Sequence, residues 1–535
     1  MSLNKLAVLA MTAVVGLMTA FPAGTMPAFA QKQGGTLRIY HRDNPPSASI
    51  HEEATVSTQL PFMGVYNNLV LYDQTKPVMS TATIVPDLAE SWAWDATNTK
   101  LTFKLRSGVK WHDGQPFTAK DVKCTWDKLM GKDKDSFRKN PRGIWYQNVQ
   151  EIAVNGDLEA TFVLGRPQPA LLAMLASGYS PVYPCHVSSR DMRTKPVGTG
   201  PFKFAEFKQN ESIRLVRNPD YFKKGKPYVD AIEMRIIPNR STRMLAFVAN
   251  EFDMTFQQDI TIPLLKDMKN QAPNAICEAA PQYVHRNLMV NQEVAPFKDP
   301  KLRKALALAI DRQPFIDILG EGKGDIGGNM LPLPEGQWGM PPEEMAKMTG
   351  YTNYEQNVVE AKKIMEGLGY SADKPLKVKV STRNIPLYRD PAVILLDQLK
   401  KIYVDAELEV VDSTIWHAKA ARRDYTIGMN LTGMAVDDPD PVFYENYACK
   451  SERNYTQYCN PEVDKMIDQQ SQELDVGKRK RLVWAIEQKL NDELARPVIF
   501  HPREATCWHP HVKGFVQHVN GIYNNWRLED VWLDK

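Results

Sequence analysis

The sequence has almost no net charge and, after its first 30 residues, no long hydrophobic run. Its 66 lysines and arginines nearly balance 63 aspartates and glutamates, which leaves a formal charge of +3. A chain this balanced has no broad positive field to attract nucleic acid or an anionic membrane. No segment after the N-terminal region is apolar enough to span a bilayer. Any partner must therefore be recognised by a specific site.

The sequence also lacks the short motifs of common hydrolases. It has no Gly-x-Ser-x-Gly turn, no His-Glu-x-x-His helix, no paired-cysteine zinc pattern and no phosphate-binding Walker spacing. Ser-x-x-Lys occurs several times but without its companion motifs, which indicates chance matches. These absences favour a protein without catalytic turnover and without a cofactor. An exported hydrolase with an unrecognised site is the alternative from another class.

The N-terminus has the three-part layout of a secretory signal peptide. Lys5 precedes an uncharged apolar run over residues 6–21, and small residues lead to Ala28 and Ala30. The run is shorter than the ~20 residues that a membrane span needs. We expect cleavage after residue 30, export to the periplasm and a mature chain of 505 residues.

Strand and helix patterns alternate along the mature chain, which predicts a mixed α/β fold. The clearest helices are expected at residues 299–319, 391–403 and 477–494. Strands are expected at residues 376–381 and 407–411, with a helix between them as in a βαβ unit. The length of the chain suggests two to four structural units.

Three segments carry a specific likeness to a known family. Residues 108–122, GVKWHDGQPFTAKDV, follow an alternating strand and lead into a helix that Thr118 can cap. Residues 197–222 and 297–312 supply two further segments of the same kind. Together they resemble the large solute-binding proteins of bacterial ABC importers for peptides and nickel, called solute-binding protein family 5.

That resemblance implies a two-lobed, hinged periplasmic-binding-protein fold (type II, large cluster). The first lobe would comprise residues 31–280 plus 496–535, with an extra subdomain at about 58–184. The second lobe would comprise residues 281–495. Because the chain would cross between the lobes twice, it would form a hinge that lets them close on a ligand.

Arg383 and the acidic group Asp437, Asp438 and Asp440 are the main candidate ligand contacts. Each follows a predicted strand, where loops tend to face a cleft. The resemblance implies that Arg383 holds a ligand carboxylate and that Asp437 holds its amino group, with Asp438 beside it. A planar guanidinium suits a carboxylate, and a carboxylate suits an ammonium. The alternative is that the arginine is a surface cation and the acids form a solvated turn.

Aromatic side chains are expected to complete the pocket, because ligand sites favour aromatic walls with a few polar anchors. Trp416, Tyr40 and Trp94 are the candidates. Each is also of a type that often belongs to a core.

The six cysteines give one informative spacing. Cys449 and Cys459 flank a polar loop, and the related peptide-binding proteins often carry a cysteine pair here, which favours a disulfide. Cys124 lies on a helical stripe and is expected in a core, whereas Cys185, Cys277 and Cys507 are undecided. Cys507, His509 and His511 would share one face of a strand, which leaves a metal role open as an alternative.

The sequence thus predicts a periplasmic substrate-binding component of an ABC importer. It would capture a short peptide, act as a monomer, bind no nucleic acid and deliver its ligand to permease subunits that a separate ATPase drives. A metal chelate, an opine or an oligosaccharide in the same fold is the alternative within the binding class.

Overall fold

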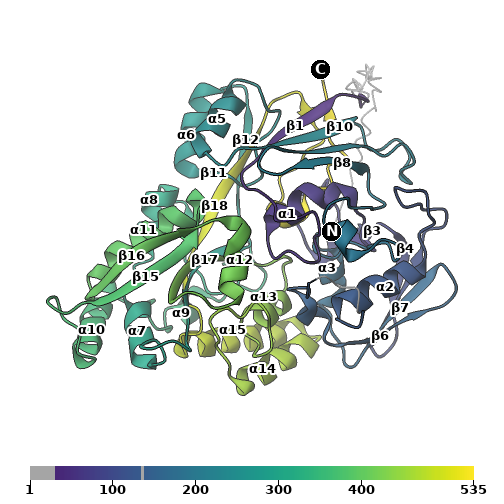
Figure 1. Ribbon diagram of the computed structural model, residues 1–535. Helices are drawn as coiled ribbons and strands as arrows, with labels where there is room; N and C mark the ends of the chain where they lie inside the picture. The colour runs from purple at the N-terminus through teal and green to yellow at the C-terminus, as the bar shows by residue number, and fades with distance from the viewer. Residues whose placement is uncertain (1–30, 134–137) are drawn as a thin grey trace, which may run out of the picture.

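The computed structural model describes residues 31–133 and 138–535, and it confirms the mixed α/β class. The predicted signal segment, residues 1–30, lies outside the described residues. Figure 1 shows a sheet around β1 at one end of the molecule, a larger sheet around β15 and β17 at the other, and helices α13 to α15 between and below them. Among the described helices, none is long and apolar enough to cross a bilayer.

The first sheet has four strands in the order β1-β10-β9-β8. Only β1 and β10 run parallel, and the other pairs are antiparallel. Arg42 and Asp43 follow the end of β1 directly, which carries them out of the sheet toward the middle of the molecule. The strands are β1 Thr36–His41, β8 Phe202–Lys208, β9 Ser212–Arg217 and β10 Ala231–Ile236.

A second four-stranded sheet, β4-β5-β7-β6, carries the family-like segment. β5 alternates buried and exposed side chains as its sequence predicts, and the helix α2 that follows begins with the predicted capping box of Thr118 and Asp121. The elements are β4 Ala89–Trp94, β5 Lys100–Leu105, α2 Ala119–Leu129, β6 Val149–Val154 and β7 Glu159–Leu164.

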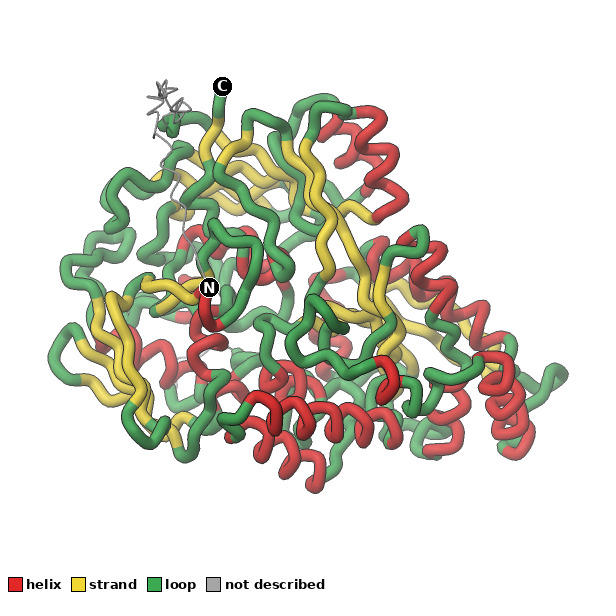
Figure 2. Tube along the Cα trace, turned by 180° about the vertical axis from the view of Figure 1, so that it is seen from behind, coloured by secondary structure: helices red, strands yellow, loops and turns green. Residues whose placement is uncertain are grey.

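The largest sheet has the order β11-β18-β13-β17-β15-β16, with β12 and β14 also paired to β18. β18 pairs with two different strands along its length. Its first part pairs with β13 and its second part with β12. β18 therefore connects the two regions, and Figure 2 shows long strands running between the upper and lower parts of the molecule. The strands are β11 Ile260–Thr261, β12 Ile276–Pro281, β13 Val284–Val290, β14 Gly324–Asp325, β15 Leu376–Arg383, β16 Val404–Val411, β17 Ile427–Gly433 and β18 Val498–Trp508.

The predicted βαβ unit is present. β15 and β16 are parallel over their whole length, and helix α11, Pro386–Lys400, connects them and packs on both. The strand β15 is longer than predicted and ends at Arg383 itself. β17, the parallel neighbour on the other side of β15, ends at Gly433, so both candidate segments leave the same edge of the sheet.

The predicted helix over residues 299–319 is two helices, α7 Pro300–Leu308 and α8 Gln313–Gly320. Pro314 stands in the first turn of α8 and has no backbone N–H with which to continue α7. The remaining helices of this half include α10 Tyr354–Gly367, α12 Ser413–Ala421, α13 Pro439–Asn446, α14 Pro461–Gln472 and α15 Val476–Asp492. The short helices α1 Val56–Phe62 and α16 Gly521–Asn524 lie against each other beneath the first sheet.

Candidate ligand-binding site

A small buried cavity lies where the two ends of the molecule meet. One side is formed by the segment after β1 and the start of α1, and the other by the ends of β15 and β17, by α12 and α13, and by the loop after α13. The C-terminal segment adds Ile522 and Tyr523. The cavity has about 30 Å³ of space for water, which is room for roughly two water molecules.

Arg383 reaches this cavity from the end of β15, as the sequence predicts. Its side chain is 3% exposed, so it is not a surface cation. Nε donates to Ser413 Oγ at 3.1 Å, Nη1 to the Tyr388 hydroxyl at 3.0 Å and Nη2 to Asp43 Oδ2 at 2.6 Å. Burial alone would lower the pKa of Arg383, but Tyr388 and Asp43 outweigh it and the net shift is upward. The guanidinium is therefore charged and bridges the two sides of the cavity.

Two more arginines share a single carboxylate on the cavity wall. Arg142 Nε lies 3.4 Å from one oxygen of Glu445, and Arg453 Nε lies 2.8 Å from the other. Both arginines also donate to the backbone oxygen of Ala54, at 3.3 Å and 2.9 Å. The Arg142 guanidinium lies 3.4 Å from the centre of the Tyr179 ring. These contacts again join an early segment of the chain to the region around α13.

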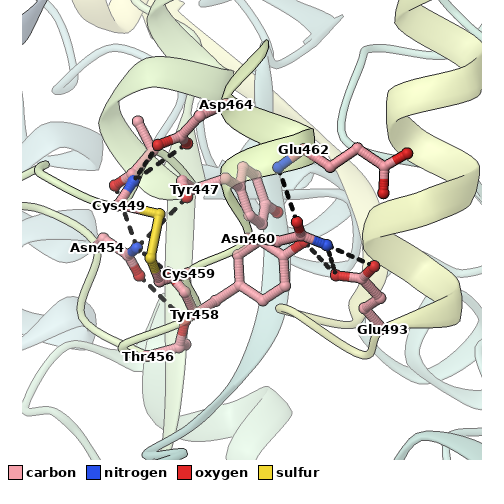
Figure 3. Close-up of a disulfide and its surroundings, with 11 residues drawn as sticks. Tyr447, Cys449, Asn454, Thr456, Tyr458, Cys459, Asn460, Glu462, Asp464 and Glu493 are labelled. Carbon is pink, nitrogen blue, oxygen red and sulfur yellow. Dashed lines mark hydrogen bonds between the residues drawn. A yellow bond between two sulfur atoms is a disulfide. The ribbon is translucent and has the colours of Figure 1, made fainter. Parts of the chain in front are cut away.

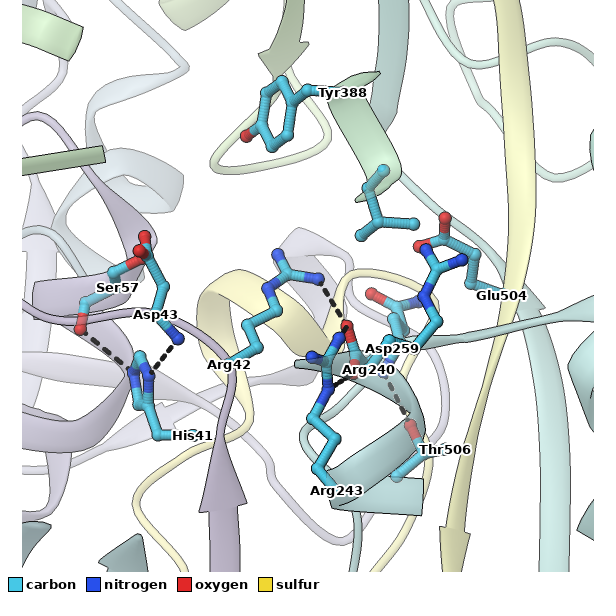
Figure 4. A network of polar contacts seen from close by, with 12 residues as sticks. His41, Arg42, Asp43, Ser57, Arg240, Arg243, Asp259, Tyr388, Glu504 and Thr506 are labelled. Carbon is cyan, nitrogen blue, oxygen red and sulfur yellow. Dashed lines mark hydrogen bonds and ion pairs between the residues drawn. The ribbon is translucent and has the colours of Figure 1, made fainter. Parts of the chain in front are cut away.

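A fourth arginine, Arg42, lines the cavity from the segment after β1. It pairs with Asp259 at 3.2 Å, and Arg243 pairs with the same carboxylate at 2.8 Å (Figure 4). Its guanidinium also lies 4.5 Å from the centre of the Phe256 ring. Asp43, next to it in sequence, accepts from Ser57 Oγ at 2.6 Å. The start of α1 thus fixes the carboxylate that faces Arg383.

His417, on α12, is part of the cavity wall. Neither ring nitrogen has a hydrogen-bond partner within residues 31–133 and 138–535, and both are shielded from solvent. Burial, reinforced by Arg383 and Arg453, holds the pKa of His417 well below its usual value. The imidazole is neutral, so it can donate one hydrogen bond and accept another.

The acidic group beyond β17 has a different environment. Asp438 caps α13 and forms a two-bond ion pair with Arg479 at 2.6 and 2.8 Å. Asp440 is fully buried and accepts from Arg479, from the Gln470 and Ser471 side chains of α14, and from Gln168. Neither is a solvated turn. Both carboxylates are committed to holding α13, α14 and α15 together.

Asp437 is half-buried and is not among the residues that line the cavity. Its backbone oxygen accepts from Trp338 Nε1 at 3.1 Å, and its Oδ1 has no hydrogen-bond partner in the described part of the chain. Burial raises the pKa of Asp437 to about 7, partly offset by a hydrogen bond to Tyr283 and reinforced by Asp438. The structure brings Arg383 to the cavity but does not bring Asp437 there.

None of the three aromatic residues predicted for the pocket is among the residues that line this cavity. Trp416 is fully buried in a small core with Met289, Val411 and Tyr455, and it lies on a different face of α12 from His417. Tyr40 is buried within the first sheet beside Phe252. Trp94 ends β4 and lies half-buried on the β4-β5-β7-β6 sheet. The aromatic residues that do line the cavity are Tyr179, Tyr388 and Tyr523.

The site also depends on a glycine at the end of β17. A Cβ atom on Gly433 would come within 1.7 Å of the Tyr523 hydroxyl, which belongs to α16. The absence of a side chain at this position lets the C-terminal segment pack against the edge of the large sheet. The wall of the cavity is therefore completed by residues that lie about 90 positions apart in the sequence.

Two disulfides are formed. Cys449 and Cys459 are bonded as predicted and close the loop after α13 (Figure 3). The undecided Cys277 and Cys507 form the second bond, across the β12 and β18 pair. Cys124 is half-buried and Cys185 is exposed, and both are free thiols.

The alternative of a metal face at Cys507, His509 and His511 is contradicted. The Cys507 sulfur is bonded to Cys277, and the two histidines bond the Phe247 carbonyl and the Asp253 carboxylate. Within residues 31–133 and 138–535, no group of three or more histidines, cysteines and acids is arranged to hold a metal ion.

The sequence matches the family described as bacterial extracellular solute-binding proteins, family 5, over residues 83–454. That is more than half of the chain. This protein belongs to that family. The chain is 26% identical to the oligopeptide-binding protein AppA of Bacillus subtilis, over 100% of this chain and 98% of that protein. It is 27% identical to the periplasmic oligopeptide-binding protein OppA of Salmonella typhimurium, over 80% and 81% of the two chains.

Solved structures confirm the two-lobed fold of this family 5 protein. The structure of Haemophilus influenzae OppA in complex with RPPGFSPFR superposes with a TM-score of 0.83, covering 95% of this chain and 100% of that chain at 20% identity. The structure of Bacillus subtilis AppA in complex with a nonapeptide gives a TM-score of 0.82 over 95% and 100% at 22% identity. The family is one of binding proteins, in agreement with the prediction that the protein is not an enzyme.

Several cavity residues of this family 5 protein escaped the sequence reasoning. Arg42 follows a strand directly, which is the same signal that indicated Arg383. Arg142 and Arg453 stand in irregular segments, where no hydrophobic period shows which way a side chain points. His417 sits one position after Trp416, and only the packing of α12 distinguishes the residue of the core from the residue of the cavity.

Proposed function

We propose that this protein captures short peptides between its two lobes and delivers them to the permease of an ABC importer. The observation that carries the proposal is the buried Arg383, which is held at the meeting point of the lobes and pairs across it with Asp43. The relatives AppA and OppA, which are named as oligopeptide-binding proteins, support the same substrate class.

Arg383 is the proposed anchor for the carboxylate of the ligand. Its guanidinium has the fork of donors that fits a carboxylate, and Ser413 and Tyr388 hold it in place. Asp43 occupies one arm of that fork. A ligand carboxylate would replace it, and the released Asp43 would be free to accept from the ammonium group of the peptide. Asp43 thereby takes the role that the sequence suggested for Asp437.

Binding requires the lobes to open, because pockets for such ligands measure about 300 Å³ or more and this cavity is far smaller. We place the hinge at the two strand connections between the lobes. One is the turn between β12 and β13, and the other is the point near Arg503 where β18 changes partner from β13 to β12. The predicted second crossing, at residue 496, lies 503 − 496 = 7 residues before that point. A ligand that contacts both lobes would favour the closed form.

The remaining parts of the proposal concern the setting of the protein. Residues 1–30 would direct export to the periplasm, and the mature protein would work as a monomer. The lobes would comprise residues 31–280 plus 496–535, with the subdomain at about 58–184, and residues 281–495. The closed form would dock on the permease subunits, and a separate ATPase would drive transport.

Mass spectrometry of the native protein tests the proposal directly. Protein purified without denaturant would be unfolded in acid and the released small molecules identified. Short peptides in roughly equimolar amount are the expected result. The same peptides incubated with fresh protein should be recovered uncut, because a binder does not turn over its ligand. Release of a sugar or a metal chelate alone, or steady cleavage of the peptides, would contradict the proposal.

A further inference from the structure

The cavity wall carries more positive than negative charge. Its lining includes four arginines and one carboxylate, namely Arg42, Arg142, Arg383, Arg453 and Glu445. The side chains of Arg42, Arg142 and Arg383 are 3 to 7% exposed, and that of Arg453 is 13% exposed. Water therefore screens these charges poorly, and their neutralisation depends on carboxylates close by.

The carboxylates that contact these arginines are too few to balance them. Glu445 serves both Arg142 and Arg453. Asp259 serves both Arg42 and Arg243. Asp43 serves Arg383 alone. Among residues 31–133 and 138–535, five guanidinium groups thus face three carboxylates, which leaves 5 − 3 = 2 positive charges in excess.

Neighbouring charged groups do not remove this excess. Arg286 is paired with Glu504, so that pair is neutral. Glu52 and Glu53, which precede Ala54, are matched by Arg193 and Arg138. His417 is neutral and, with both of its ring nitrogens unpartnered in the described residues, adds a hydrogen-bond donor to the wall.

Leaving buried cations uncompensated costs several kcal/mol per ion, and a ligand of opposite charge removes that cost. We propose that the ligand of this protein carries surplus negative charge, as a peptide with acidic side chains or another compact polycarboxylate. This inference rests on the proposed function and names its substrate class. Arg383 would hold one anionic group. Arg142 and Arg453 would hold a second, because these two arginines share the single carboxylate of Glu445.

Calorimetric titration with matched dipeptides tests the inference. Glu-Glu and Gln-Gln have nearly the same shape, but Glu-Glu carries two additional carboxylates. At about pH 8 the wild-type protein should bind Glu-Glu at least about tenfold more tightly than Gln-Gln. Glutarate provides a third arm, since it is a dicarboxylate that lacks any peptide bond.

The Arg453→Gln variant connects the preference to the cavity. It removes one excess charge and leaves Glu445 paired with Arg142, so the ratio of the Glu-Glu and Gln-Gln affinities should fall at least about fivefold. Arg422→Gln is the matched control, because Arg422 is an exposed arginine directly after the helix that carries His417, and it should preserve the ratio. Circular dichroism confirms that each variant is folded.

The outcomes separate this inference from the proposed function. Equal affinity for Glu-Glu and Gln-Gln, or tighter binding of Gln-Gln, overturns the inference and leaves peptide capture intact. Binding of glutarate without either dipeptide overturns peptide capture and supports the anionic ligand. Failure of all three to bind contradicts both. If Arg453→Gln has the same ratio of Glu-Glu and Gln-Gln affinities as the wild type, the preference does not come from this cavity wall and the inference is overturned.

Discussion

Arg383 and the acidic group of Asp437, Asp438 and Asp440 leave the same edge of the large sheet, yet they have opposite roles. Arg383 lies at the end of β15 and reaches across the cavity to Asp43. Asp438 and Asp440 lie beyond β17 and point into the second lobe, where Arg479 of α15 holds both. Position at the end of a strand thus predicts nearness to the cavity, but it does not predict the direction of the side chain.

The difference arises from what packs on each segment. The Arg383 guanidinium donates to the uncharged hydroxyl groups of Ser413 and Tyr388, and its ion pair is with Asp43 across the cavity. The acids cap α13 and are enclosed by helices that follow about 30 to 40 residues later. A charge that its own lobe already neutralises cannot serve a ligand without loss of stability.

The largest effect is expected from Asp438→Ala. Removing Asp438 takes away the two-bond partner of the buried Arg479 and leaves Asp440 as its remaining carboxylate, which costs about 3 kcal/mol of unfolding free energy, the lower end of the cost of breaking a buried pair. Urea unfolding followed by circular dichroism measures the loss. Asp424→Ala is the control, because that carboxylate is 67% exposed and its removal should change stability by less than about 0.5 kcal/mol. Similar stability of the two variants would remove the structural role given to Asp438.

Arg383→Gln should act mainly on binding. The ligand carboxylate would lose its charged partner, so the affinity for the co-purified ligand should fall about 100-fold or more. Arg389→Gln is a suitable control, since Arg389 lies on the neighbouring α11 with 44% of its side chain exposed. Isothermal titration measures both. A loss of less than about threefold for Arg383→Gln would mean that the guanidinium only links the lobes.

Asp437→Asn should give the smallest effect, visible as a change in pH dependence. The pKa of Asp437 is raised from 3.8 to about 7 in the folded protein. Between these values the folded state keeps a proton that the unfolded chain has lost, so stability falls as pH rises through this window. The variant lacks the titrating group. In full, this rise in the pKa corresponds to about 4 kcal/mol, but Asp437 is half-buried and solvent reduces that figure. The variant should therefore match the wild type near pH 4 and exceed it by at least about 1 kcal/mol near pH 8.

Urea unfolding at the two pH values checks this expectation. Glu487→Gln is an independent comparison, because burial also raises the pKa of Glu487 to about 7 in a different part of the second lobe. If Asp437→Asn were less stable than the wild type near pH 8, the carboxylate would have an ionised partner that this account does not include.

The sequence was sufficient for the fold and for part of the site. Alternating and helical periods gave β5, α2, β15, α11 and β16, because those elements bury one regular face. The spacing of Cys449 and Cys459 is local, and their bond could be predicted. Cys277 and Cys507 are 230 positions apart, and only the pairing of β12 with β18 brings them together.

The cavity wall could not be predicted in the same way. Arg142 and Arg453 meet at Glu445 although more than 300 positions separate them, and neither belongs to a periodic element. Their meeting depends on how distant segments of the chain pack together. The same limit applies within one helix. Trp416 packs in a core, whereas His417, the next residue, lines the cavity.

The most direct measurement titrates one co-purified ligand into three proteins, the wild type, Arg383→Gln and Asp437→Asn. The account predicts that Arg383→Gln loses about 100-fold in affinity while Asp437→Asn stays within about threefold of the wild type. An equal and large loss in both variants would contradict it, because Asp437 would then contact the ligand and the cavity around Arg383 would not define the site.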